Sequence, residues 1–290
     1  MVKHFKFLFL SSIPPVSEEG QTLKEEEGMI PGNLDESLSF LGQKSDFRIV
    51  GFSNGLLLRG INPEQNGDNC AWYEQNTNYI ICNPVTRQVR HLPKTNKPSL
   101  YTPPVFICRG GNATSSSSSS LDEVHYEVVR VRLTNIRLFT KTVEIETFSS
   151  LTHTWVEDTR VSDLPFLLTH DTRTAFVIDD VLFWGATSGG PSGYKYHNRA
   201  LLAYDRRATG LQCAKVIEAP TGQDGQGGKG SGYFGGHFGP SEGKVQFGKY
   251  DDVNFEVWVL EDYRSSTNWF MKYRVSNEII GVQAFGRFQV

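Results

Sequence analysis

The sequence contains no long hydrophobic run, and this absence sets the first limit on its function. No stretch of its 290 residues approaches the about 18 consecutive apolar residues that a membrane-spanning helix needs. The apolar run near the N-terminus, Phe7–Leu10, is too short for a secretory signal, and no A-x-A site follows it. We therefore expect no membrane association and a cytoplasmic or nuclear location.

Paired cysteine and histidine motifs are also missing. The 4 cysteines include no C-x-x-C pair, and the 7 histidines form no H-x-x-x-H or H-E-x-x-H pattern. These are the spacings that common zinc sites use, so we expect no metal site and no cofactor. Without a secretory signal, the thiols are expected to be reduced.

The chain lacks a strong charge of either sign. Its formal net charge is -3, which gives no electrostatic reason to expect nucleic-acid binding. A local basic cluster, Arg130, Arg132 and Arg137, alternates with apolar residues. Because alternate residues of a strand share one face, this cluster is interpreted as the solvated face of a strand.

Catalytic motifs of known spacing do not occur either. There is no G-x-S-x-G nucleophile motif. The glycines of Gly225–Gly230 match G-x-G-x-x-G by letters only, because neither a strand before them nor a helix after them is indicated. The adjacent carboxylates Asp179 and Asp180 are expected in a turn, facing water. We therefore expect no catalytic residue and no enzymatic activity of the chain's own.

What the sequence does contain favours short strands and tight turns. It has 28 Gly and 19 Phe but only 3 Met. In Phe47–Gly60, the pair Asn54-Gly55 separates two apolar runs, a strong hairpin signal because both residues tolerate positive φ. A strand–turn–strand unit, Tyr79–Pro93, follows. At its turn Pro84 fixes φ, and the Asn83 side chain can bond the backbone two residues on.

This combination of hairpin and strand–turn–strand recurs along the chain. The layout of residues 47–93 repeats at 174–220, and shorter forms lie at 124–158 and 243–275. The turns of the successive units fall near Asn83, Ser149, Asp205 and Asp262, at intervals of 66, 56 and 57 residues. About four short strands in each interval is typical of β-propeller blades. We predict an all-β fold, a β-propeller that is irregular or incomplete, with blades of about four short antiparallel strands.

Two segments fall outside this repeat. Residues 1–46 are expected to form an N-terminal strand and an acidic, partly mobile polar loop, and residues 47–290 the propeller domain. Within that domain, residues 112–120 are serine-rich and cannot bury apolar area. They are expected to be a disordered insertion.

Two sets of residues stand out as candidates. Aromatic side chains in expected loops are candidate partner anchors, because exposed aromatics often carry binding energy. These are Trp72, Tyr73, Tyr194 and Tyr196. The second set is expected to have a structural role in turns and strands, with Trp155 and Trp258 buried between strands. It comprises Asn54, Gly55, Asn83, Pro84, Thr86, Arg87, Trp155, Asp205, Trp258 and Trp269.

An ordered series of motifs resembles the F-box-associated β-propeller domain of plant F-box proteins, a kelch-like propeller. The hairpin motif G-x-x-N-G-L-L is matched by residues 51–57, and N-P-x-T-R followed by L-P by 83–87 and 92–93. The later matches, in the family's order, are Tyr126–Arg130, Ser149–Trp155, Val181–Gly185, Leu201–Asp205, and Val257–Tyr263 with Trp269. The resemblance covers about residues 47–275.

The resemblance implies a role in protein ubiquitination. In that family an N-terminal F-box docks to the Skp-type adaptor of a cullin–RING ubiquitin ligase, and the propeller holds the protein to be ubiquitinated. The chain is thus expected to be a protein-interaction module, the substrate receptor of an SCF-type ubiquitin-protein ligase complex. No F-box-like segment is recognised before Phe47. Binding to a Skp-type adaptor is therefore expected only if an F-box is supplied elsewhere.

An alternative function stays open from the residues alone. The turn Ser149–Trp155 echoes the S-x-D-x-G-x-T-W turn of sialidase propellers, although Leu151 and His153 replace its Asp and Gly. The chain is also rich in aromatic residues, at 12%. The alternative is a carbohydrate-binding or glycan-hydrolysing propeller.

Overall fold

The computed structural model describes residues 47–61, 78–95, 102–109, 124–132, 139–168, 174–189, 198–208, 213–220, 235–250, 254–264 and 267–276. These residues form sixteen β-strands and no α-helix. The strands are β1 (Phe47–Ser53), β2 (Leu56–Ile61), β3 (Asn78–Cys82), β4 (Val89–His91), β5 (Val105–Arg109), β6 (His125–Arg132), β7 (Thr140–Ser149), β8 (Thr154–Leu168), β9 (Ala175–Ile178), β10 (Val181–Ser188), β11 (Asn198–Asp205), β12 (Ala214–Glu218), β13 (Gly235–Ser241), β14 (Lys244–Tyr250), β15 (Asn254–Leu260) and β16 (Trp269–Ser276). No helix suited to crossing a membrane occurs in these ranges.

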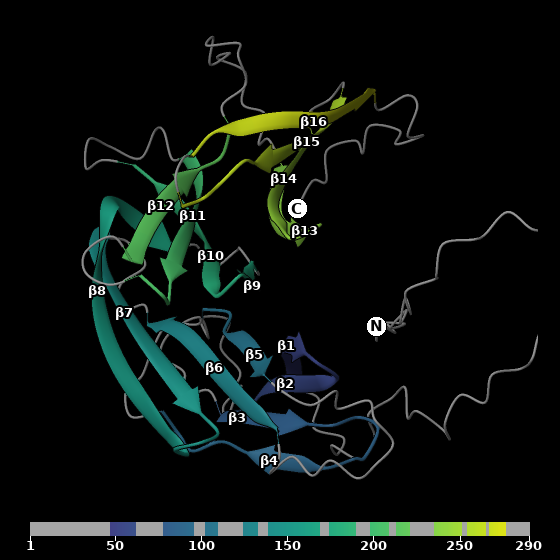
Figure 1. Cartoon of the computed structure of the whole chain (residues 1–290), viewed down its shortest axis with the longest axis vertical. Coiled ribbons are helices and arrows are strands. Elements are labelled where there is room, and N and C mark those ends of the chain that lie inside the picture. Colours follow the sequence, from purple (N-terminus) through teal and green to yellow (C-terminus); the bar gives the residue numbers. More distant parts are fainter. Residues whose placement is uncertain are drawn as a thin grey trace, which may run out of the picture.

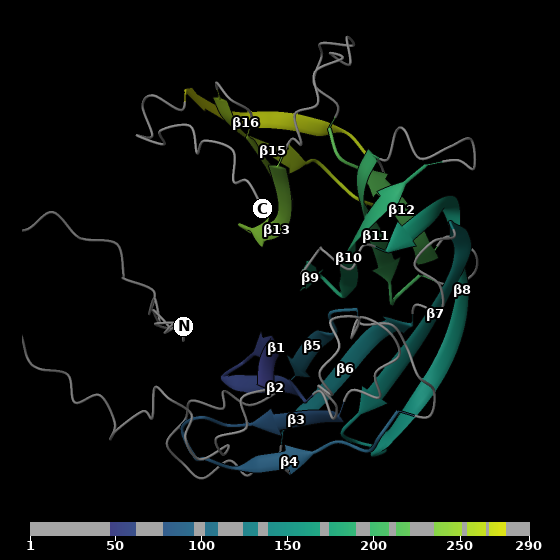
Figure 2. The same ribbon diagram turned by 180° about the vertical axis from the view of Figure 1, so that it is seen from behind.

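The strands form four blades of four strands each, arranged in chain order along an arc (Figures 1 and 2). Blade 1 is β1–β4, blade 2 is β5–β8, blade 3 is β9–β12 and blade 4 is β13–β16. Neighbouring strands within a blade pair antiparallel. The first strands, β1, β5, β9 and β13, lie on the inner side of the arc and contact one another in turn. The predicted all-β propeller architecture is confirmed.

Blades 2 and 3 are joined into one continuous eight-stranded sheet. β12 pairs parallel with β8 at Ala214 and Ser162, and the end of β8 then pairs antiparallel with β10. Between these two pairings β8 crosses blade 3, and its last residues, which pair with β10, bury Phe166 and Leu168 in the layer between blades 2 and 3. The long strand β8 therefore belongs to blade 2 but covers part of blade 3.

The turns repeat from blade to blade as the sequence predicts. Two-residue turns with positive φ at both positions connect the first and second strands of blades 1, 3 and 4, at Asn54-Gly55, Asp179-Asp180 and Glu242-Gly243. This geometry matches the twist of paired strands. The four sequence turns, at Asn83, Ser149, Asp205 and Asp262, all connect the third strand to the fourth.

A side-chain oxygen opens each of these third-to-fourth-strand turns. The carboxamide Oδ1 of Asn83 accepts hydrogen bonds from the Val85 and Thr86 amides, at 2.9 and 3.2 Å. Asp205 and Asp262 accept from the amide two residues on in the same way, as does the Ser149 hydroxyl. The bond from a side-chain oxygen to the amide two residues on, predicted for Asn83, thus recurs in all four blades.

The hydrophobic core is divided into three layers, one between each pair of successive blades. Tyr79 and Ile81 of blade 1 pack with Tyr126 and Phe148 of blade 2. Apolar residues of β6, β7 and β8 pack with those of β10, β11 and β12. The third layer joins Phe183 and its neighbours in blade 3 to blade 4. Because each blade is buried on the face toward its neighbour, the blades are held together mainly by apolar contact.

Two expectations about charged and aromatic side chains are wrong. Arg130 is not on a solvated face: it is 3% exposed and forms an ion pair with Glu146 of β7. Among the tryptophans that the structure describes, the fully buried one is Trp184 of β10, at 1% exposed. Its indole Nε1 donates to the Pro103 carbonyl, 3.0 Å away. Trp155 and Trp258 are only half-buried. Trp155 lies at the start of β8, the outer strand of blade 2, whereas Trp258 lies in β15, between β14 and β16.

Several predictions fall on residues outside the described ranges. They concern the N-terminal strand and polar loop of residues 1–46, the serine-rich insertion at 112–120, the glycines of 225–230, and Arg137.

Candidate functional site

The residues expected to have a structural role do lie in turns and at blade boundaries. Asn54 and Gly55 form the first turn of blade 1, while Asn83, Pro84, Thr86 and Arg87 form its last. Asp205 opens the equivalent turn of blade 3. These turn residues hold the ends of strands together and belong to the framework of the blades.

The four loop aromatics expected to contact a partner lie outside the described residues. These are Trp72, Tyr73, Tyr194 and Tyr196. Their role as partner anchors stays a prediction.

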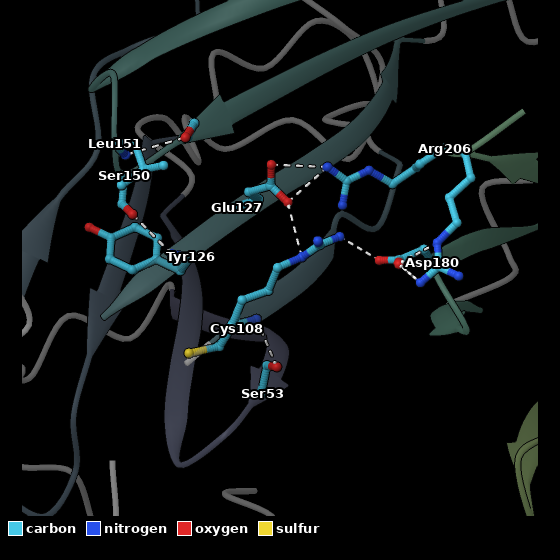
Figure 3. Close-up of polar contacts among 11 residues, drawn as sticks. Ser53, Cys108, Tyr126, Glu127, Ser150, Leu151, Asp180 and Arg206 are labelled. Carbon is cyan, nitrogen blue, oxygen red and sulfur yellow. Dashed lines mark hydrogen bonds and ion pairs between the residues drawn. The ribbon is translucent and has the colours of Figure 1, made fainter. Parts of the chain in front are cut away.

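A cluster of charged residues joins strands β5 and β6 of blade 2 to two turns of blade 3 (Figure 3). Arg109, at the end of β5, pairs with Asp180 in the β9–β10 turn and lies 3.9 Å from the Glu127 carboxylate. Arg206 donates to Glu127 at 2.9 Å, and Arg207 donates to Asp180. Positive and negative side chains alternate across the boundary between blades 2 and 3, so each charge has a neighbour of opposite sign.

Blade 4 is tied to the same turns by Arg264. Its guanidinium lies 3.2 Å from the Asp205 carboxylate and donates to the main-chain carbonyl of Asp179 at 3.0 Å. The expectation that Asp179 and Asp180 face water is therefore wrong for Asp180, whose side chain is 19% exposed and held by two arginines.

The electrostatics of Asp180 favour a structural role. Burial opposes ionisation of this carboxyl, but the hydrogen bond from Arg207 and the charge of Arg109 outweigh burial and keep its pKa below the usual value. A general acid needs a raised pKa. Asp180 is thus an ionised partner that holds blades 2 and 3 together.

Two of the tryptophans expected to have a structural role, Trp155 and Trp269, form the same kind of hydrogen bond at two blade boundaries. Trp155, at the start of β8, donates its indole Nε1 to the Pro93 carbonyl just after β4, at 2.9 Å. Trp269, at the start of β16, donates to the Glu218 carbonyl at the end of β12, at 2.8 Å. In both contacts, the start of an outer strand is thus attached to the end of the outer strand of the preceding blade.

A cleft of about 550 Å³ lies beside the second of these contacts, between blades 3 and 4. Its lining includes Trp258 and Trp269 of blade 4 and Leu164 of β8. Val216, Glu218, Ala219 and Pro220, at and just after the end of β12, also line it.

The Trp258 side chain at the cleft is held in place by charged groups. The indole Nε1 of Trp258 donates to Glu256 at 2.9 Å, and Arg274 donates to the other oxygen of the same carboxylate at 2.6 and 3.0 Å. Glu256 is 4% exposed. Burial raises its pKa, but the bonds from Trp258 and Arg274 dominate and lower it, so the carboxylate stays ionised. The cleft is therefore preorganised.

The sequence alone did not reveal this cleft. It singled out Trp258 and Trp269 as strand residues, but Leu164 and Glu218 carry no motif. Their contribution depends on the path of β8 over blade 3, for which the sequence contains no pattern.

Two further features of the described ranges concern metal ligands and carboxylates. No cluster of three or more His, Cys, Asp or Glu able to hold a metal ion occurs there. The inner strands β1, β5, β9 and β13 contain no Asp or Glu.

Comparisons with known proteins locate the fold only. No protein-family model matches the chain. No curated protein matches it either. Among solved structures it is similar to a mutant of the Bombyx mori GH32 β-fructofuranosidase BmSUC1 in complex with sucrose, with 11% identity and a TM-score of 0.38 over 80% of this chain and 49% of that one. It is also similar to an α-L-arabinofuranosidase from Lactobacillus brevis, with 9% identity and a TM-score of 0.35 over 75% of this chain and 69% of that one.

These neighbours correct one expectation. The chain spans about half the length of the silkworm enzyme. Both neighbours are named as glycoside hydrolases, which runs against the expectation of a chain without enzymatic activity, and we withdraw that expectation. At these TM-scores the likeness assigns no activity or substrate to the present chain.

Proposed function

We propose that the chain is a protein-binding β-propeller that recognises its partner at the cleft between blades 3 and 4. The observation that carries this proposal is the pair of half-buried tryptophans, Trp258 and Trp269, whose indoles are fixed by hydrogen bonds. Tryptophan is enriched among the residues that dominate binding energy, and preorganised side chains lose little entropy on binding. The polar groups of Thr267, Asn268 and Glu218 at the cleft provide a rim.

The series of sequence motifs suggests which kind of protein would be bound. The motifs that resemble the F-box-associated domain fall at equivalent turns and strands of successive blades. This supports a role as the substrate-recognition part of an SCF-type ubiquitin ligase. The bound partner would then be a protein to be ubiquitinated, and the Skp-type adaptor would be engaged through an F-box supplied by another segment or chain.

Affinity capture followed by reconstitution tests this proposal. The full chain is used as bait in cell extract, with tag alone and heat-unfolded chain as controls, and enriched proteins are purified and tested for direct binding. The chain is then fused to an F-box and added to adaptor, cullin and ubiquitination enzymes. We expect a directly bound protein that is ubiquitinated only with the fusion. Failure to enrich any protein over both controls would overturn the proposal.

Glycan binding is a second candidate, favoured by the same cleft. Indole rings beside Asn268, Thr267 and Glu218 offer apolar faces and hydrogen-bonding groups together, as a sugar ring requires. A glycan array with wild-type chain and the Trp258→Ala variant tests binding, and a panel of chromogenic glycosides tests hydrolysis. Glycan hits that disappear in the variant would favour this function over protein binding.

A further inference from the structure

The outer edge of β12 presents its backbone to the cleft. β12 pairs antiparallel with β11, and just beyond the end of β12 the main-chain N–H of Ala219 donates to the carbonyl of Arg199 in β11. Because hydrogen-bonding direction alternates along an antiparallel strand, the amide groups of Val216 and Glu218 point away from β11. Two contacts agree with this: the Val216 N–H donates to the Asp163 carboxylate at 2.8 Å, and the Glu218 carbonyl accepts from Trp269.

Two further main-chain groups of these residues face the same way, the Val216 carbonyl and the Glu218 N–H. In a pair of parallel strands, a residue donates its N–H to the carbonyl of the residue that precedes its neighbour on the other strand. Its own carbonyl accepts from the N–H of the residue that follows that neighbour. A parallel strand with one residue opposite Ile217 would therefore bond to both groups. β8 already pairs parallel with β12 at Ala214, and leaves this edge after Ser162. The cleft lies where a continuation of that parallel strand would run.

We propose that the cleft receives an extended segment of the partner protein, which adds to β12 as a parallel strand. Strand addition to an exposed sheet edge is a recurrent mode of peptide recognition, in which main-chain bonds give affinity and alternate side chains give specificity. This proposal rests on the protein-binding function above and specifies how the partner is held.

Side-chain direction sets the chemistry of the bound segment. Directly neighbouring residues of paired strands project to the same face. Ile217 projects into the layer shared with blade 4, so the residue opposite it projects toward the face that carries Trp258 and Trp269. Its neighbours in the segment project toward Leu164 and Val216. The segment should carry a bulky apolar residue at the central position.

Defined peptides test this inference directly. The probes are blocked nonapeptides of alternating Ser and Thr with Leu, Phe or Ala at the centre, and the Leu peptide N-methylated at the central residue. Binding is followed by fluorescence anisotropy and by the emission of the protein's tryptophans. We expect the Leu and Phe peptides to bind at least about tenfold more tightly than the Ala peptide. N-methylation removes the donor to Val216, and should weaken binding similarly.

Two substitutions on β8 locate the site without disturbing the core. Leu164 is 43% exposed and lies at the cleft, whereas Val156 is 59% exposed and does not line it. Leu164→Asp should weaken both peptide binding and capture of the cellular partner about tenfold or more, and Val156→Asp should leave both unchanged. Circular dichroism checks that both variants fold.

The outcomes separate this inference from the proposed function. A captured partner whose affinity is unchanged by Leu164→Asp overturns strand addition but leaves protein binding intact. Equal binding of the N-methylated peptide also overturns it. A wild-type chain that dimerises by light scattering, with Leu164→Asp monomeric, assigns the edge to a second copy and overturns the partner segment.

Discussion

The buried pair of Arg130 and Glu146, on neighbouring strands of blade 2, provides the sharpest test of how charge is buried in this fold. Both side chains are 3% exposed, and the Arg130 guanidinium also lies 5.7 Å from the centre of the Trp155 ring. Replacing Glu146 by Ala leaves the arginine charge buried without its carboxylate. Removing one member of a buried pair costs about 3–5 kcal/mol, much of it from the uncompensated charge. We therefore expect Glu146→Ala to lower the free energy of unfolding by that amount.

The neighbouring pair on the same two strands is a matched control. Arg132 and Glu144 are 16% and 33% exposed, so water screens them, and Glu144→Ala should cost about 1 kcal/mol or less. The double variant Arg130→Met with Glu146→Leu removes both buried charges and should recover most of the stability lost in Glu146→Ala. Urea unfolding followed by circular dichroism, with an unchanged slope, measures all three. Equal losses in Glu146→Ala and Glu144→Ala would refute the reasoning, as would a double variant no more stable than Glu146→Ala.

Three further predictions concern the blade boundaries and a buried thiol. Trp155→Phe removes the bond to Pro93 and should cost about 1 kcal/mol, whereas Trp155→Ala also loses the ring contacts and should cost about 3 kcal/mol in urea unfolding. Equal costs would contradict this. Burial raises the pKa of the Cys82 thiol to about 11, so at pH 8 an aromatic disulfide should label this cysteine only on unfolding, as peptide mapping would show. Because the pKa of Asp180 is lowered in the folded protein, its contribution to stability is present above the unfolded pKa of about 3.9 and is lost as pH falls through the folded pKa. Asp180→Asn should flatten the fall in urea midpoint between pH 5 and pH 3, and an unchanged fall would argue against this role.

The blade repeat is predictable from the sequence because its signals are local. A turn such as Asn54-Gly55 requires positive φ at both residues, and the Asn83 side chain bonds an amide only two residues away. Such constraints act within a few residues, so a single sequence displays them. The spacing of the four turns at Asn83, Ser149, Asp205 and Asp262 is therefore enough to indicate the order of the blades.

The environment of particular side chains was not predictable, because it depends on distant segments. Arg130 alternates with apolar residues as an exposed residue would, but its burial is set by Glu146 and by Trp155 across the sheet. Trp184 and Trp258 each lie in a strand flanked by two others, yet Trp184 is fully buried in the layer between blades 2 and 3, whereas Trp258 is half-buried at the cleft between blades 3 and 4. The cleft itself requires β8 to cross blade 3, a contact between segments about 50 residues apart.

The crossing of β8 from blade 2 onto blade 3 also has a mechanical consequence. Main-chain hydrogen bonds run without interruption through these two blades, whereas blade 1 and blade 4 are joined to them through side chains and single indole bonds. Mechanical force or thermal fluctuation would thus separate blade 1 and blade 4 first, while blades 2 and 3 stay together as one rigid unit. The cleft lies at the boundary between blade 3 and blade 4. A segment bound in it would therefore change how far blade 4 can move relative to blade 3.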